Sequence, residues 1–399
     1  MSEVMQPVQL SRTEDKPAWG AVVSMALGVF ALVTAEFLPA SLLTPMAADL
    51  RISEGVAGQA VTVTAVVALV TSLLISAATR RIDRRHVLLA FSVLLILSNL
   101  LVAFAPGLTF LLLGRVLLGI ALGGFWTMSA AVCMRLVPEP LVPRALSMIF
   151  SGVSAATILA APVGSYLGEI IGWRNVFLLT LVLGVVTLVV QLVTLPSMAP
   201  SGLTRLRTLA DVLLRPGIGV GMLAAMLVFT GHFAFFTYIR PFLETATGSG
   251  IGAVSAILLG FGIANFLGTL LAGPLLERSL RLTLIAMPLL MGLLGVSLVA
   301  LVNPAVNAVM VALWGMAFGA VPVAWSTWLT RTVPDQAESA GGLLVAAVQL
   351  AIAVGAAAGG MLYDVSGASG VFSASSLVLL LAGVIIVLGV RSGTAAATV

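Results

Sequence analysis

The sequence predicts an all-α membrane protein with twelve transmembrane helices in two six-helix halves and both termini in the cytoplasm. Three observations support this fold: an apolar composition, apolar runs of spanning length, and an alternating distribution of basic residues. Hydrophobic residues make up 60% of the chain and charged residues only 9%, whereas an ordinary soluble chain carries about 25% charged residues. Such a chain has too little polar surface for water, so we expect much of its surface to face lipid.

The apolar runs follow one another along the 399 residues, and each spanning helix takes roughly 20 residues. Residues 1–18 come first. They are polar and hold no apolar segment followed by a cleavage site, so we expect a cytoplasmic tail rather than a signal peptide. The twelve spans are predicted at 19–43, 55–79, 87–106, 108–134, 145–168, 173–195, 217–240, 251–276, 282–302, 305–331, 338–362 and 369–390.

One connection is longer than the others. Residues 196–216 are polar, hold three arginines and an aspartate, and lie in the middle of the chain. We therefore expect a cytoplasmic linker at 196–216 between an N-terminal half at 19–195 and a C-terminal half at 217–391, with a second cytoplasmic tail at 392–399.

The basic residues test the number of spans. With the N-terminus in the cytoplasm, 15 of the 19 Lys and Arg residues fall on inner segments, three fall on outer segments, and Arg115 lies within a span. A wrong number of spans would break this alternation. The net charge of +4 therefore reports topology and contact with anionic lipid of the inner leaflet, and we expect no nucleic-acid partner.

Several chemistries are excluded by residue counts. The only lysine, Lys16, lies in the N-terminal tail, so the sequence has no phosphate-binding loop with a Gly-Lys-Ser/Thr step. The only cysteine, Cys133, excludes an internal disulfide and a cysteine-based metal cluster. The two histidines, His86 and His232, are far apart. We expect no enzyme, no metal and no cofactor. The alternative from a different functional class is a channel or a membrane sensor, but the sequence shows no polar pore stripe and no large soluble domain.

The two halves resemble each other at an offset near 196 residues. Because six is an even number, two such copies have the same orientation, as in transporters whose substrate site lies between the halves near the middle of the membrane. The matches pair RLVPE at 135–139 with RTVPD at 331–335, Gly119 and Gly123 with Gly315 and Gly319, and Pro45 with Pro241.

Short motifs resemble the major facilitator superfamily, in particular its twelve-span drug and sugar efflux proton antiporters. SAATRRIDRR at 76–85 is similar to the family's Gly-x-Leu-Ala-Asp-Arg-x-Gly-Arg-Arg loop, with the basic pair kept and both glycines and the aspartate replaced. GPLLERSLR at 273–281 is a better copy. GRVLLG at 114–119 is similar to the family's intramembrane arginine motif, and APVGS at 161–165 is similar to its antiporter motif. GWRNVF at 172–177 resembles the sequence with which span six begins in this efflux group.

Longer strings are similar to the purine ribonucleoside exporters of this group: ISEGVAGQ at 52–59, LGGFW at 122–126, FAFFTYIRP at 233–241 and VPVAWSTW at 321–328. The resemblance covers about 19–391 and implies the major facilitator fold and a place in the bacterial inner membrane. It implies export of purine ribonucleosides, of the inosine, adenosine or guanosine type, in exchange for protons by alternating access. The proton gradient would supply the energy, and we expect a monomer. Sugars such as arabinose, or drugs, are the alternative substrates.

Three ionisable residues lie clearly within the predicted spans: Glu36, Arg115 and His232. A charge at the bilayer centre costs roughly 2.5–3.5 kcal/mol, so such a group is rarely without a role. All three lie at a similar depth, and the resemblance implies that their spans line the central cavity. We expect Glu36 to carry the proton and to pair, when ionised, with Arg115 or a cationic His232. A fixed Glu36–Arg115 pair, substrate hydrogen bonding by Glu36, or a neutral His232 in a helix contact are the alternatives.

Aromatic and amide side chains are the candidates for substrate binding. A purine stacks well on an aromatic ring, and its edges and the ribose need polar partners. Aromatic residues also form interfacial belts and lipid-facing surface, which is the alternative interpretation. The candidates are Gln59, Phe125, Trp126, Phe236, Tyr238, Asn265, Trp325, Trp328 and Gln349.

The two equivalent inner loops are predicted to gate the transporter. We expect them to act as charge latches that stabilise the outward-open state, with Asp83 in place of the missing motif acid, although exposed ion pairs alone contribute only about 0–1 kcal/mol. The candidates are Arg80, Asp83, Arg84 and Arg85 in the first loop and Gly273, Glu277, Arg278 and Arg281 in the second.

Overall fold

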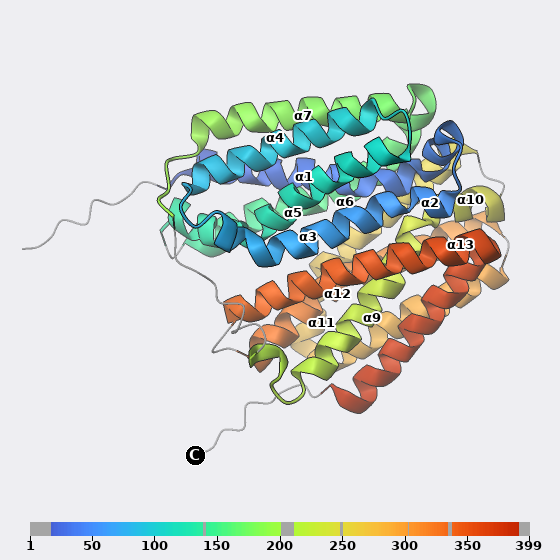
Figure 1. The fold of residues 1–399 in the computed structure, drawn as a ribbon. Helices are drawn as coiled ribbons and strands as arrows, with labels where there is room; N and C mark the ends of the chain where they lie inside the picture. The colour runs from blue at the N-terminus through green and yellow to red at the C-terminus, as the bar shows by residue number, and fades with distance from the viewer. Residues whose placement is uncertain are drawn as a thin grey trace, which may run out of the picture.

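The computed structural model describes residues 17–138, 141–200, 211–247, 250–301, 303–333 and 337–390. Within these ranges the regular structure is helical and contains no strand. Ten of the described helices are long and apolar enough to cross a membrane, and Figure 1 shows them packed in two groups, one above the other in this view. The expected all-helical membrane fold is confirmed to this extent. Residues 1–16, 201–210 and 391–399 of the predicted tails and linker lie outside the described ranges, as do residue 139 of the first copy of the repeat motif and residues 334 and 335 of the second.

The first group of helices precedes the predicted linker. Capping marks two of its starts, because Ser53 accepts a hydrogen bond from the Val56 amide and Asp83 accepts one from the Arg85 amide. The members of the first group are α1 Trp19–Leu50, α2 Glu54–Ala57, α3 Gln59–Ala78, α4 Arg84–Ala103, α5 Leu108–Leu136, α6 Val142–Ile170 and α7 Trp173–Thr194.

The second group contains α9 Ile218–Thr237, α10 Ile239–Thr247, α11 Ile251–Ala300, α12 Pro304–Thr332 and α13 Ala337–Gly389. Two of these are unusually long, with 50 residues in α11 and 53 in α13. A straight 50-residue helix would measure about 75 Å, more than twice the roughly 30 Å hydrocarbon core of a bilayer. Each is in fact two helices that meet at a kink, at Ser279 in α11 and at Gly367 in α13.

The kink in α13 depends on glycine. Gly367 has a φ of 66°, in the left-handed region that residues with a side chain adopt with difficulty. Figure 1 shows the second piece of α13, in red, turning back from the first.

Glycines allow close helix packing at matched places in both groups. A Cβ atom on Gly119 would lie 2.7 Å from the Thr64 carbonyl oxygen, so α5 can approach α3 only without a side chain there. A Cβ atom on Gly315 would likewise lie 2.5 Å from the Phe261 carbonyl oxygen, where α12 packs on α11. The matched glycines of the sequence repeat therefore perform the same packing role.

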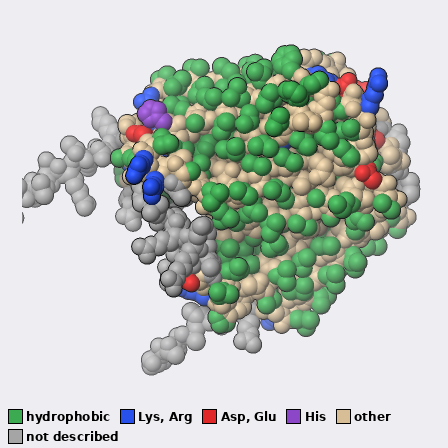
Figure 2. Space-filling model, in the orientation of Figure 1, with side chains coloured by type: hydrophobic (Ala, Val, Ile, Leu, Met, Phe, Trp, Pro, Cys, Tyr) green, Lys and Arg blue, Asp and Glu red, His purple; other side chains and the backbone are tan. Residues whose placement is uncertain are grey.

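The two groups meet along two helix pairs. α6 of the first group packs against α11 of the second, and α3 packs against α13. Figure 2 shows charged side chains at the left and right edges of the molecule and mostly hydrophobic side chains over the wide surface between them. Large side chains such as Val193 and Leu388 are 82% exposed on this type of surface, as expected where helices face lipid.

We name the two ends of the molecule by their helices. The α10 end contains the C-terminus of α1, the short helices α2 and α10, and the start of α11 (right in Figure 1). The α4 end contains the C-terminus of α3, the start of α4 and the C-terminus of α7 (left in Figure 1).

Candidate functional site

A cavity of about 570 Å³ lies between the two helix groups. This volume is within the roughly 300–1,000 Å³ of typical small-molecule sites. Its lining comes from α1, α5 and α6 of the first group and from α9, α11, α12 and α13 of the second. Of the residues predicted from sequence, the structure brings six to this cavity: Glu36, Trp126, His232, Phe236, Asn265 and Gln349.

The cavity extends toward the α4 end. On α12 its lining runs from Phe318 to Ser326, in the half of the helix nearer that end. On α13 it runs from Leu344 to Ile352, again in the part nearer the α4 end.

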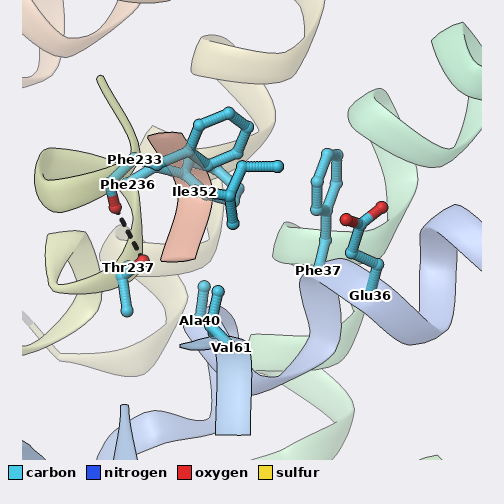
Figure 3. Close-up of a pocket in the computed structure, with 8 residues that line it drawn as sticks. All are labelled: Glu36, Phe37, Ala40, Val61, Phe233, Phe236, Thr237 and Ile352. Atoms are coloured by element: carbon cyan, nitrogen blue, oxygen red, sulfur yellow. Dashed lines mark hydrogen bonds between the residues drawn. The ribbon is translucent and has the colours of Figure 1, made fainter. Parts of the chain in front are cut away.

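Toward the α10 end the space narrows to a small void of about 10 Å³, which is close to the minimum for one water molecule. Figure 3 shows Glu36 and Phe37 of α1 on one side of this void and Phe233 and Phe236 of α9 on the other. The rings of Phe37 and Phe236 meet edge to face with centroids 5.3 Å apart. These aromatic contacts close the cavity toward the α10 end.

The cavity contains more phenylalanine than the sequence predictions included. Around His232, the ring of Phe318 lies parallel at 3.2 Å and that of Phe236 at 5.8 Å, while Phe233 meets it edge-on at 5.1 Å. On α9, residues 229, 233 and 236 are all phenylalanine at spacings of four and three, which places them on one helix face. That spacing was the sequence signal for this wall. The further phenylalanines of the lining are Phe37, Phe150, Phe229, Phe233, Phe261 and Phe318.

Arg115 lies behind the cavity and not in its lining. Its Nε donates hydrogen bonds to the Ala60 carbonyl oxygen at 3.0 Å and to Thr64 Oγ1 at 2.8 Å. Nη1 donates to the Ala35 carbonyl oxygen at 2.8 Å, and Nη2 reaches that of Glu36 at 3.4 Å. Among the described residues, Arg115 forms no ion pair with a carboxylate. The expected Glu36–Arg115 ion pair is therefore not formed in this conformation, because backbone carbonyls of α1 and α3 hold the guanidinium.

Five predicted substrate-binding residues do not line the cavity. Phe125 is 2% exposed and belongs to the core of the first group. Gln59 begins α3, near the α10 end. Trp325 and Trp328 pack edge to face at 5.4 Å within the core of the second group. Tyr238 is also buried, and its hydroxyl donates to the Ala356 carbonyl oxygen at 3.0 Å.

The first predicted gating loop is bound to its own helix group. Asp83 accepts hydrogen bonds from the Ser197 hydroxyl and from the Met198 amide at 3.0 Å, beside its capping bond to Arg85. These bonds lower the pKa of Asp83 to about 2, with the Ser197 bond as the largest cause. Arg84 Nη1 donates to Thr79 Oγ1 at 2.8 Å, and Arg85 Nη2 donates to the Leu192 carbonyl oxygen at 2.8 Å.

The second loop shows the same pattern. Arg281 Nη2 donates to the Val387 carbonyl oxygen at 3.3 Å, within the second group. The remaining candidates, Arg80, Gly273, Glu277 and Arg278, are exposed. The latch role of both loops stays a prediction for the opposite conformation.

Polar contacts between the groups occur instead at the α10 end, where sequence reasoning had placed none. Arg240 Nε binds Glu244 at 2.7 Å, and its Nη1 donates to the Ser41 carbonyl oxygen on α1 at 2.6 Å. Thr44 on α1 donates to the other oxygen of Glu244 at 2.7 Å, and Arg240 Nη2 lies 3.9 Å from Glu169 on α6.

A second contact between the groups lies nearby. The Tyr363 hydroxyl on α13 donates to Glu54 on α2.

Thr44 and Arg240 are 196 residues apart, so the internal repeat was a signal that could have pointed to the contacts of Arg240.

Comparison with known proteins gives the family. The Major Facilitator Superfamily model matches residues 25–345 and 221–397. The proteins named purine ribonucleoside efflux pump NepI of Salmonella enteritidis and Salmonella typhimurium are each 48% identical over 377 residues, which is 94% of this chain and 95% of theirs.

Solved structures share the fold. A bacterial homolog of the human lysosomal transporter Spinster, inward-facing and occupied, has a TM-score of 0.74 at 14% identity and covers 92% of this chain and 96% of its own. A D-xylose-proton symporter has a TM-score of 0.75 at 18% identity, with 94% and 97% covered. These proteins are transporters and not enzymes, and with the apolar helices they indicate a multi-pass protein of the bacterial inner membrane. The chain belongs to the Major Facilitator Superfamily.

Proposed function

We propose that the chain exports purine ribonucleosides, of the inosine, adenosine or guanosine type, in exchange for protons by alternating access. The observation that carries this proposal is the aromatic cavity, whose volume suits one small solute and whose rings suit a flat base. Asn265, Ser326 and Gln349 in its lining can bind the ribose hydroxyls and the edges of the base. The name of the 48% identical relatives supports the same substrate class.

The proposed topology has twelve spans, because α11 and α13 would each cross the membrane twice. The kinks at Ser279 and Gly367 support this division. The two halves would be 19–195 and 217–391, and the distribution of arginines supports cytoplasmic termini. The α4 end then faces the cytoplasm, and the cavity in this conformation would receive substrate from that side.

Glu36 is the proposed proton carrier. It lines both the cavity and the void that closes it, and its carboxylate has no ion-pair partner among the described residues. An unpaired ionised carboxylate is costly among closed apolar rings but is solvated when the cavity admits water. Opening and closing would therefore change the protonation of Glu36, and the proton gradient would supply the energy without a cofactor.

Inside-out membrane vesicles with an acidic lumen test this function. We expect labelled inosine to accumulate in vesicles that contain the protein and to leave when a protonophore collapses the gradient. Labelled arabinose should not accumulate. Accumulation of arabinose in place of inosine would assign the alternative substrate class, and inosine accumulation that ignores the protonophore would contradict proton exchange.

Replacement of Glu36 by glutamine separates coupling from binding. We expect Glu36→Gln to reduce gradient-driven inosine accumulation to the level of protonophore-treated vesicles, because a carboxamide cannot carry the proton. Exchange of labelled for unlabelled inosine needs no net proton transfer and should continue. Asp211→Asn, an exposed position outside the cavity, is the matched control. Full gradient-driven accumulation by Glu36→Gln would refute this role.

A further inference from the structure

One ring nitrogen of His232 is already engaged in a hydrogen bond. Nε1 of Trp314 on α12 lies 3.2 Å from Nδ1 of His232 on α9, and the two residues are 0% and 2% exposed. An indole N–H donates a hydrogen bond and cannot accept one. Nδ1 of His232 is therefore the acceptor and carries no proton.

This hydrogen bond fixes both the charge and the tautomer of the ring. A neutral imidazole has one N–H group, and an imidazolium has two. Because Nδ1 carries no proton, His232 is neutral with its proton on Nε2, whereas a cationic ring would place an N–H group against the N–H of Trp314. In this conformation His232 is therefore not the cationic partner of Glu36.

The remaining nitrogen is directed to the cavity. Phe318 and Phe236 stack on the faces of the imidazole, and Phe233 meets it edge-on. Nε2 makes no hydrogen bond with a described residue. It is also not fully enclosed by other atoms. Since His232 belongs to the cavity lining, its Nε2–H is a donor available to a ligand there.

We propose that His232 is a fixed neutral hydrogen-bond donor to the substrate and that Trp314 is the positioning residue that keeps the proton on Nε2. The ligand that fits is a flat heteroaromatic ring with an in-plane lone pair on a ring nitrogen or a carbonyl oxygen. A purine base has such lone pairs at its edges, so the inference rests on the proposed function and adds a specificity-determining contact to it.

A purely structural role for Trp314 has to be distinguished from this one. Trp314 also fills the core, where its ring stacks on Phe235 with centroids 3.8 Å apart. Trp314→Phe keeps most of that packing and removes the N–H group. Trp173→Phe is the matched control, because Trp173 also donates its N–H, to Asp49 at 3.0 Å, but lies at the start of α7 outside the cavity.

The tautomer is measured by nitrogen NMR on protein labelled in histidine, with His86→Asn leaving His232 as the only signal. We expect an unprotonated Nδ1 and a protonated Nε2 in this background and with Trp173→Phe, and a mixture of tautomers with Trp314→Phe. A protonated Nδ1 before Trp314 is changed would overturn the inference, whatever the substrate is.

The donor role is measured by binding to the full-length purified transporter. The probes are inosine, 7-deazainosine, which lacks the N7 lone pair, 3-deazainosine, which lacks the N3 lone pair, and purine riboside, which lacks the 6-oxygen. We expect one analogue to bind about tenfold more weakly than inosine, as for a lost hydrogen bond. His232→Phe should abolish this difference, His232→Gln, which keeps an N–H donor, should restore part of it, and Trp314→Phe should reduce it.

The outcomes separate this inference from the proposed function. If the unchanged protein binds inosine but does not discriminate against any of these analogues, or if His232→Phe discriminates equally well, the donor role is wrong and the proposed function stands. If the unchanged protein does not bind inosine, the proposed function fails and the substrate contact fails with it.

Discussion

The two ends of the molecule are held by polar contacts of different kinds. At the α10 end, Arg240 and Glu244 of the second helix group bind Ser41 and Thr44 of the first. At the α4 end, Asp83 binds Ser197 and Met198, which follow α7 of the same group at the start of the predicted linker. The first set can form only while the two groups are close together. The second set joins the start of α4 to residues that follow α7, so it does not depend on the distance between the groups.

This difference explains the shape of the cavity. The contacts between groups and the aromatic void lie at the α10 end, and the cavity extends toward the α4 end, where the gating candidates hold their own groups. Among these contacts, the polar ones that join the two groups lie at the α10 end. A transporter that alternates between two states must weaken this set of contacts when the α10 end opens.

Loss of Arg240 should weaken the contacts between the two groups most strongly. Its side chain is 3% exposed, and removal of one partner from a buried ion pair costs about 3–5 kcal/mol. Glu244 is 25% exposed, so we expect Arg240→Ala to destabilise the closed α10 end by about 2 kcal/mol, or about 30-fold in population. Spin labels at the exposed positions Ala48 and Gly252 would report a longer distance between the groups.

Two controls belong to that measurement. Glu244→Gln keeps an oxygen acceptor for Arg240 and should shift the distance less. Arg174→Ala removes an ion pair with Asp49 at the same end, but that pair joins α7 to α1 within the first group, so it should leave the distance unchanged. An equal shift in Arg174→Ala would show that contacts between the groups have no special role.

Loss of the Tyr363 hydroxyl should have a smaller effect of the same sign. Tyr363→Phe removes the hydrogen bond to Glu54 and keeps the ring that stacks on Tyr238 with centroids 5.3 Å apart. We expect a loss of about 1 kcal/mol, or about fivefold in population, measured with the same spin labels. A distance distribution identical to that of the unchanged protein would show that only Arg240 and its partners stabilise the closed α10 end.

Asp83→Ala should affect only the α4 end. The bonds from Ser197 and Met198 lower the pKa of Asp83 from 3.8 to about 2, so their stabilising contribution is complete above about pH 4 and disappears as the pH falls toward 2. The difference in thermal midpoint between the unchanged protein and Asp83→Ala should follow this pH dependence, with a value of roughly 2 °C at neutral pH.

Hydrogen exchange locates the Asp83 effect. The Met198 amide should exchange about fivefold faster in Asp83→Ala, and Ser197→Ala, which removes only one of the bonds, should give an intermediate rate. A changed distance between Ala48 and Gly252 in Asp83→Ala would contradict the independence of the two ends.

Sequence patterns predicted the helices well because apolar runs and basic residues follow directly from the bilayer. They predicted the cavity less well, since an apolar helix in this protein is apolar on every face and its pattern does not distinguish core from cavity. Phe125 and Trp126 are adjacent, so about 100° of helix rotation separates them, and only Trp126 lines the cavity. Trp325 and Trp328 share a face as predicted, but that face packs into the core.

The contacts of Arg240 could not be predicted from the helix pattern, because they join segments far apart in the sequence. The pairing of Glu36 with Arg115 was expected from their similar depth and from the resemblance, which implies that their spans line one cavity. Depth does not specify the direction of a side chain, and the backbone carbonyls of two neighbouring helices proved to be the partners of the arginine.

The contacts between the groups at the α10 end also depart from the symmetry of the sequence repeat. The repeat relates Thr44 to Arg240, and both bind the same carboxylate of Glu244. The two copies differ at this position, because one offers a neutral hydroxyl and the other a guanidinium to the same carboxylate. The contact between the duplicated halves is therefore asymmetric at this position. The duplication provides two matched halves, and their difference at this position makes the two facing surfaces complementary.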